Sequence, residues 1–150
     1  MTIIQCYAPT NQATKEDKDN FYNQLQTVLD RAHRRDITLL MGDMNAKVGE
    51  ENTGREFTMG REGLGVMNEN GKLFADFCGQ NDFIIGGTFF KHCNIHKATW
   101  KSPDLATHNQ IDHIAISRRW RGQLLDVRVQ RGADAGSDHE MVLARLKPGS

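Results

Sequence analysis

The strongest constraint on the fold is a short apolar run, Ile37 to Met41, which stops abruptly at Gly42-Asp43. Five residues with almost no polar member, closed by glycine, predict a strand buried on both faces. A helix is predicted before it, from about Lys15 to Arg34, because Thr14 can cap its first turn and its apolar residues fall on one stripe. The chain opens in another strand, Thr2 to Tyr7. This strand–helix–strand order predicts an α/β architecture.

The remaining pattern extends this architecture within one domain of 150 residues. A long glycine-containing loop over 46–66 precedes a second helix predicted over 68–80, and long loops in compact domains are often functional. Further strands are predicted over 83–85, 98–101, 110–117, 124–131 and 141–146. Two helices followed mostly by strands predict an α/β sandwich with mixed sheets.

The charge composition is balanced, with 19 basic and 19 acidic residues, and gives no global field that would favour nucleic acid. One local run is basic, between Ser117 and Gly132. Such a run is usually a solvated face, and it becomes a phosphate-binding rim only if the functional site lies nearby. The basic residues of the run are Arg118, Arg119, Arg121, Arg128 and Arg131, against one acid, Asp126.

The three cysteines, Cys6, Cys78 and Cys93, are odd in number and scattered. Cys6 and Cys78 lie in apolar runs and are expected to pack as small hydrophobic residues, so no disulfide framework is predicted. The sequence shows no signal peptide and no apolar stretch that could span a bilayer. We therefore expect no membrane partner and a nuclear or cytoplasmic rather than a secreted location.

Polar side chains that can act on phosphate occur at the ends of several predicted strands. Tyr7 ends the first strand, Asp43 and Asn45 follow the second, Asp112 begins a later one, and Asp138-His139 precede the last. Each signal is weak alone, since Asp and Asn are common turn residues after strands. Together they predict one site for metal-assisted attack on a phosphate.

Asp112 carries the sharpest argument, because it shares one face of its strand with Ile114 and Ile116. An unpaired carboxylate on an apolar face is costly, so Asp112 needs either backbone donors or an imidazole partner. We expect His139 to be that partner, with Asp112 orienting the ring for catalysis. Asp138 then points to the other side, toward a metal or the leaving group.

Asp43 and Asn45 stand two residues apart, so both project to one side if the backbone stays extended. The acid could take a proton from water, and the amide could position that water or a phosphate oxygen. Tyr7 could donate its phenol hydrogen to a phosphate, the alternative being an ordinary half-buried aromatic residue. A structural zinc site is a weaker alternative, because its residues lack two compact ligand pairs. Those residues are His92, Cys93, His96, His108 and His113.

These segments resemble the endonuclease/exonuclease/phosphatase superfamily, the fold of DNase I and of the major apurinic endonucleases. The wording of the motifs is most similar to the endonuclease domains of RTE-type non-LTR retrotransposons and to the craniofacial-development-protein-2-like proteins derived from them. The motifs that carry the resemblance are Tyr7-Ala8-Pro9-Thr10, Gly42-Asp43-Met44-Asn45-Ala46-Lys47-Val48-Gly49, Thr99-Trp100-Lys101-Ser102-Pro103-Asp104, Asn109-Gln110-Ile111-Asp112-His113-Ile114 and Gly136-Ser137-Asp138-His139-Glu140.

The resemblance implies a Mg²⁺-dependent DNA endonuclease, with Mn²⁺ as an alternative ion. Tyr7 would contact the phosphate, Asp43 would activate water or protonate the leaving group, and Asn45 would position it. Asp112 would orient His139 on the scissile phosphate, and Asp138 would help to hold the metal. The DNA contacts that we carry over from the resemblance, together with the arginine run, are Trp100, Ser102, Asn109, Arg118 and Arg119.

One departure from the family pattern concerns its upstream half, which holds an early Asn and the Glu that is the principal metal ligand. The chain starts after both, and Glu16, Glu50 and Glu51 lie in the wrong context to replace that Glu. We therefore expect residues 1–147 to be the C-terminal portion of a DNase I-like sandwich, with a tail over 148–150 and impaired activity. A homodimer or a complementing N-terminal half would cover the exposed sheet face.

Two other functions stay open from the sequence. One is a superfamily phosphatase acting on inositol or lipid phosphates, which the arginine run does not exclude. The other is a non-catalytic remnant that binds nucleic acid or associates with itself.

Overall fold

A four-stranded mixed sheet forms the centre of the computed structural model, which describes residues 1–33, 35–92, 97–101, 108–130 and 139–148. The strands are β1 (Thr2–Tyr7), β2 (Thr38–Asp43), β3 (Phe83–Ile85) and β6 (Asp112–Ser117), in the spatial order β1-β2-β6-β3. β1 and β2 are parallel, whereas β6 runs antiparallel to both β2 and β3. The ends of β1 and β2 and the start of β6 therefore meet at one edge of the sheet.

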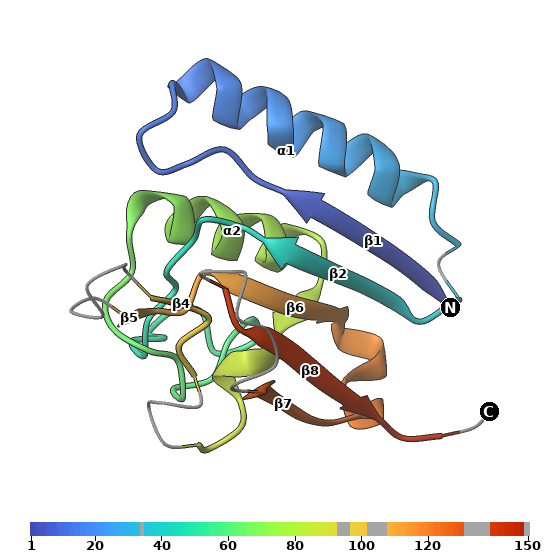
Figure 1. Ribbon diagram of the computed structural model, residues 1–150. Helices are drawn as coiled ribbons and strands as arrows, with labels where there is room; N and C mark the ends of the chain where they lie inside the picture. The colour runs from blue at the N-terminus through green and yellow to red at the C-terminus, as the bar shows by residue number, and fades with distance from the viewer. Residues whose placement is uncertain (34, 93–96, 102–107, 131–138, 149–150) are drawn as a thin grey trace.

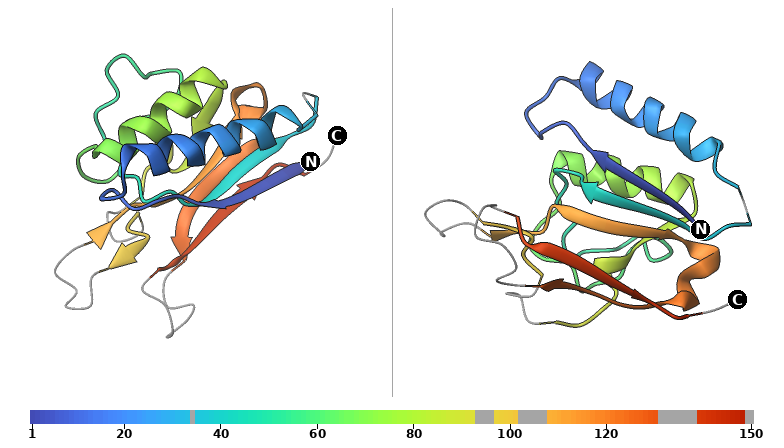
Figure 2. Two further views of the ribbon diagram at one scale, coloured as in Figure 1. Left: turned by 90° about the horizontal axis from the view of Figure 1, so that it is seen from above. Right: turned by 45° about the vertical axis from the view of Figure 1, so that its right-hand side comes forward.

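Two helices cover one face of this sheet (Figures 1 and 2). α1 (Lys15–Asp30) connects β1 to β2, and the Thr14 hydroxyl caps it by accepting from the Asp17 N–H, as predicted. α1 ends four residues before the predicted boundary. α2 (Glu69–Gln80) is capped in the same way, since the Asn68 side chain accepts from the Gly71 N–H.

A two-stranded sheet of β7 (Leu124–Gln130) and β8 (Met141–Leu146) lies on the opposite face of the central sheet (Figure 2). A second small sheet pairs β4 (Trp100–Lys101) with β5 (His108–Asn109). Two 3₁₀ turns, η1 (Gly86–Thr88) and η3 (Arg118–Gln123), follow β3 and β6. Among the residues that the structure describes, no helix is long and apolar enough to cross a membrane.

The buried apolar residues form two clusters, one on each side of the central sheet. Leu40 and Ala115 face the helices and pack with Phe74 of α2. Their sequence neighbours Leu39 and Ile116 point the other way and pack under β7 and β8. This alternation explains why strands of the central sheet are apolar on both sides, and the α/β sandwich with mixed sheets is confirmed.

Candidate active site

Three polar side chains lie in register at the edge of the sheet where β1 and β2 end and β6 begins. Tyr7 pairs with Asp43 across the parallel strands, and Asp43 pairs with Asp112 across the antiparallel ones. β2 extends two residues beyond the predicted run and so carries Asp43 into the ladder. Partners directly opposite in a sheet have Cα atoms about 5 Å apart. The sheet therefore places a phenol and two carboxylates side by side, as predicted.

His139 joins this row from the segment before β8. Its Nδ1 lies 2.8 Å from Oδ2 of Asp112, and its Nε2 lies 3.6 Å from Oδ2 of Asp43. The predicted pairing of His139 with Asp112 is confirmed at hydrogen-bond distance. The ring lies between two carboxylates, and its second nitrogen points toward Asp43.

Burial decides how these groups behave. The Asp43 and Asp112 side chains are only 11% and 18% exposed, whereas the His139 side chain is 35% exposed. Burial raises the pKa of Asp112, although hydrogen bonds from His139 and Thr99 act in the opposite direction. Tyr7 is 72% exposed, which excludes the half-buried alternative. A ligand can therefore reach the Tyr7 hydroxyl and the exposed part of the imidazole.

Gly42 lets Asp43 occupy its place. Its backbone φ of 143° is a conformation that residues other than glycine rarely adopt. A Cβ at this position would stand 1.9 Å from the carbonyl oxygen of Cys6 on β1. The glycine that ends the apolar run is thus required by the close approach of β1, directly before the site.

Asn45 differs from its prediction. The backbone does not stay extended, because Asn45 has a φ of 47° and its N–H donates to Oδ1 of Asp43 at 2.9 Å. Its side-chain amide donates to the carbonyl of Ala8 at 2.8 Å. Asn45 therefore holds Asp43 and ties the loop after β2 to the loop after β1. The extended backbone on which that prediction depends is not formed, because local turn geometry prevails over strand alternation here.

Two buried polar residues to which the sequence analysis gives no role in this site support the same edge. Asn70 of α2, 3% exposed, donates through its amide to the carbonyls of Pro9 and Asn45. His113, buried and packed on Phe74, contacts the carbonyl of Ala46 at 2.6 Å. Burial lowers the pKa of His113 to about 4, so its ring is neutral and Nε2 donates this hydrogen bond. Alternation along β6 was the one signal that could have found His113.

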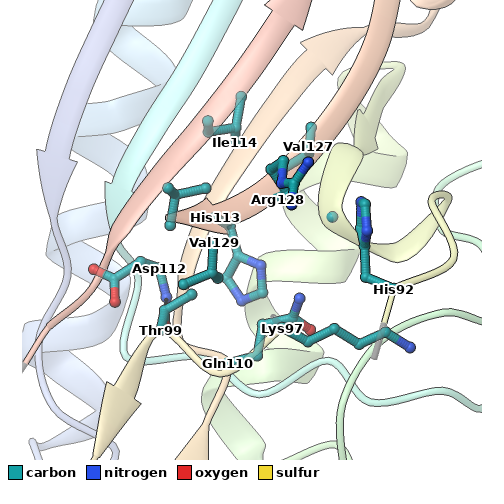
Figure 3. A pocket seen from close by; sticks show the side chains of 12 residues that line it. His92, Lys97, Thr99, Gln110, Asp112, His113, Ile114, Val127, Arg128 and Val129 are labelled. Atoms are coloured by element: carbon teal, nitrogen blue, oxygen red, sulfur yellow. Dashed lines mark hydrogen bonds between the residues drawn. The ribbon is translucent and has the colours of Figure 1, made fainter. Parts of the chain in front are cut away.

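Figure 3 shows a small cavity beside the site, lined by Thr99, Gln110, Asp112 and His113 on one side and by Lys97 and His92 on the other. The Thr99 hydroxyl accepts from the N–H groups of Ile111 and Asp112 at 2.9 and 3.0 Å. This segment thus anchors the start of β6. Thr99 belongs to one of the motifs that carry the resemblance, but the sequence alone predicts no role for it.

The predicted DNA-contacting residues fall into three groups. Trp100 lies beside the site, because it forms a bridge with His139 and pairs with Asn109 across β4 and β5. Ser102, like the predicted metal ligand Asp138, falls outside the described residues. Arg118 and Arg119 are at the opposite end of the sheet.

The position of these two arginines follows from the direction of β6. Arg118 follows the strand that Asp112 begins, and that strand spans about 17 Å from Asp112 to Ser117 at the usual rise per residue. Its side chain contacts the Asp82 carboxylate and the ring of Phe57, and Arg119 lies over Trp120. The structure does not bring them to the site, and DNA binding by them stays a prediction.

Asp43, Asp112 and His139 also form a possible metal-binding group, with one ligand atom from each lying within 4.8 Å of the others. Two carboxylates suit a hard divalent cation, and an imidazole is compatible with a transition metal. This is an incomplete set for a six-coordinate ion. The zinc alternative gains no support, because His92 contacts Asp126 at 2.8 Å and His113 contacts Ala46.

Comparisons with known proteins agree with this geometry. The profile of the family described as endonuclease-reverse transcriptase matches residues 1–143. Craniofacial development protein 2 of Tragulus javanicus and of Bos taurus are each 37% identical to the chain over 147 residues, or 98% of it. The chain spans about a quarter of the length of these relatives, 25% and 24%.

Solved structures show the same fold at lower identity. The 3'-5' exonuclease NExo of Neisseria meningitidis matches with a TM-score of 0.69 and 20% identity, over 97% of this chain and 60% of that one. An AP endonuclease of Archaeoglobus fulgidus matches with a TM-score of 0.67 and 15% identity, over 96% and 60%. The endonuclease domain of the telomere-specific non-LTR retrotransposon TRAS1 matches with a TM-score of 0.63 and 12% identity, over 96% and 57%. With the family match over most of its length, the chain belongs to the endonuclease-reverse transcriptase family of the endonuclease/exonuclease/phosphatase superfamily.

Proposed function

We propose that this chain carries part of the active site of a Mg²⁺-dependent endonuclease that nicks DNA by hydrolysis of a phosphodiester. The observation that carries the proposal is the row formed by Tyr7, Asp43 and Asp112 with the His139 ring set between the two carboxylates. The family description and the DNA-processing neighbours support a nuclease. One neighbour is titled a 3' phosphatase bound to a product DNA hairpin, which supports DNA as the substrate.

The groups of the chain divide the work according to their contacts. Asp112 accepts the Nδ1 hydrogen of His139, and in the doubly protonated ring Nε2 then donates its own hydrogen to an oxygen of the scissile phosphate. The exposed Tyr7 hydroxyl donates to the same phosphate group. These two donors hold the phosphorus for in-line attack and stabilise charge that grows in the transition state.

Asp43 is the proposed base. Its Oδ1 accepts the Asn45 N–H, which leaves Oδ2 on the side of His139 to receive a proton from water. The water oxygen bonds to phosphorus, the bond to the leaving oxygen breaks, and that oxygen takes up a proton from solvent. The proposed role of Asn45 is to hold the Asp43 carboxylate through its backbone N–H, because its side-chain amide donates to the carbonyl of Ala8.

The metal completes the proposed chemistry. We propose that Asp138 and an oxygen atom of Asp112 would hold the cation, which leaves the Asp43 carboxylate to act as the base. A bound Mg²⁺ supplies Lewis-acid neutralisation of the phosphate charge, and Mn²⁺ would suit the same oxygens. Because Mg²⁺ prefers six oxygens, we propose that water, the substrate or a segment outside these 150 residues supplies the rest.

A complementing segment or a second copy is also proposed for the face of β1 and β2 that lies away from the helices. Ile3 is 57% exposed there. A groove of about 170 Å³, lined by Gln5, Met41 and Val142 among others, runs between these strands and β8. An exposed face of a central sheet is normally covered by another layer.

A substrate panel tests the proposed function. The purified chain is incubated with supercoiled plasmid or with a phosphoinositide. Each substrate is tested in Mg²⁺, in Mn²⁺ and in EDTA, which removes the metal. We expect this chain alone to nick the plasmid weakly, and we expect EDTA to abolish the nicking. The phosphoinositide should release no phosphate. DNA binding without any nicking, even with an upstream segment of a relative added in trans, would instead favour a non-catalytic remnant.

A further inference from the structure

Thr99 stands where the two halves of the Asp112–His139 pair approach each other. It lies directly before β4 and is 1% exposed. Its hydroxyl oxygen accepts from the N–H groups of Ile111 and Asp112. The hydroxyl itself lies 3.5 Å from the carbonyl of Asn109, and its proximity to the Asp112 carboxylate opposes the rise in pKa that burial gives that group. One side chain therefore fixes the backbone at the start of β6, directly at Asp112.

The backbone of Thr99 holds the other partner. Its carbonyl accepts the Glu140 N–H at 2.8 Å, and its own N–H donates to the carbonyl of Asn109 at 2.8 Å. The next residue, Trp100, forms a β-bridge with His139. Lys101 adds an ion pair with Glu140 at 3.3 Å. The three residues from Thr99 to Lys101 thus clip the start of β6 to the segment that carries His139.

We infer that Thr99 is a positioning residue for the Asp112–His139 pair, an inference that rests on the proposed function. Asp112 begins β6, whereas His139 lies 27 residues later in the segment before β8, so a direct side-chain contact alone would let their separation vary. Thr99 fixes that separation through its hydroxyl on one side and its carbonyl on the other.

The hydroxyl is the part that a test can remove. Thr99→Val keeps the shape of the side chain but removes an acceptor for two N–H groups, one of them 3.0 Å away on Asp112 itself. A buried donor without a partner is costly, so the start of β6 must shift to find one. A shift of about 1 Å in a catalytic group lowers kcat on the order of 100-fold.

A second buried threonine provides the matched control. Thr88 is fully buried, its hydroxyl donates to the carbonyl of Ile85 at 2.6 Å, and it accepts from the Gly60 N–H at 2.9 Å. It is the same residue type, is equally buried and also accepts a backbone N–H with its hydroxyl, but its hydroxyl bonds join η1 to Gly60 and do not involve Asp112. Thr88→Val therefore shows what a buried Thr→Val change does to the fold alone.

The first measurement needs no substrate. Long-range ¹H–¹⁵N NMR of the His139 ring, at one alkaline pH and without metal, reports which ring nitrogen carries the hydrogen. We expect the wild type, Thr88→Val and Thr99→Ser to keep the hydrogen on Nδ1, facing Asp112. We expect Thr99→Val, or Thr99→Ala if the valine variant does not fold, to shift the ring several-fold toward the Nε2 form.

The second measurement is nicking by the same proteins. The inference expects Thr99→Val to lose about 100-fold in kcat with KM little changed, and Thr99→Ser to restore most of it. An unchanged His139 signal in both Thr99→Val and Thr99→Ala, or an equal change in Thr88→Val, overturns the inference. If the wild type does not nick DNA, the proposed function fails, while the ring signal still decides the role of Thr99.

Discussion

Acid should destabilise this protein through His113, whose imidazole is buried beneath the active site. The ring packs on Phe74 at a centroid distance of 5.2 Å and donates to the Ala46 carbonyl at 2.6 Å. Burial lowers its pKa from 6.5 to about 4. Between these two values the unfolded chain binds a proton at this position and the folded chain does not, so protonation favours unfolding.

The magnitude follows from that difference in pKa. At 1.36 kcal/mol per pKa unit, the full effect is about 3 kcal/mol. The stabilisation is complete above pH 6.5, falls by about 2 kcal/mol at pH 5, and is exhausted below pH 4. A loss of this size is a large part of the free energy of unfolding of a typical native protein, which is about 10 kcal/mol.

Urea unfolding between pH 7.5 and 4.5 measures this contribution when the wild type is compared with His113→Leu. The variant loses the hydrogen bond to Ala46 and is less stable at neutral pH, but its free energy of unfolding should fall less as the pH is lowered. The difference between the two proteins should shrink by about 2 kcal/mol from pH 7 to pH 5. His33→Gln, a change at an exposed histidine, should follow the wild type. Parallel curves for the wild type and His113→Leu would refute the reasoning.

Three further changes test other parts of the structure. Gly42→Ala should lower the free energy of unfolding in urea by at least about 2 kcal/mol, because the new Cβ meets the Cys6 carbonyl oxygen. Gly54→Ala, at another positive φ with nothing within 4 Å, should lower it less. Equal losses would contradict the close approach of β1. Burial raises the pKa of Cys6 to about 11 and that of Cys78 as well, so thiol labelling of both at pH 7.5 should be slow until the chain unfolds, and rapid labelling of the folded chain would contradict their packing. Sedimentation of the chain should detect self-association that Ile3→Lys weakens, and a monomer at every concentration would count against the proposed second copy.

Local pattern was enough to predict the row of strand ends. Strand alternation placed Asp112 on the face of Ile114 and Ile116, and the cost of an unpaired carboxylate there predicted its partner His139. The short apolar run that ends at Gly42 located Asp43. These inferences need only the period of a strand and the identity of a few residues.

Other features depend on contacts that no local pattern contains. The left-handed backbone of Asn45 follows from its bonds to Asp43 and Ala8, and the role of Thr99 follows from a pairing with residues 12 and 13 positions later. The position of Arg118, by contrast, could have been predicted from the sequence. A strand that begins at Asp112 must carry the residue after Ser117 to the far edge of the sheet.

The central claim is that the Asp112–His139 pair performs catalysis, and a second Asp–His pair in the same chain permits a direct test. His92 and Asp126 are also 2.8 Å apart, and neither belongs to the row of strand ends. Nicking of supercoiled plasmid in Mg²⁺ is measured for the wild type, Asp112→Asn and Asp126→Asn, each complemented with the same upstream segment. We predict a loss on the order of 100-fold or more for Asp112→Asn and near wild-type rates for Asp126→Asn. Equal rates for the two variants would contradict the account.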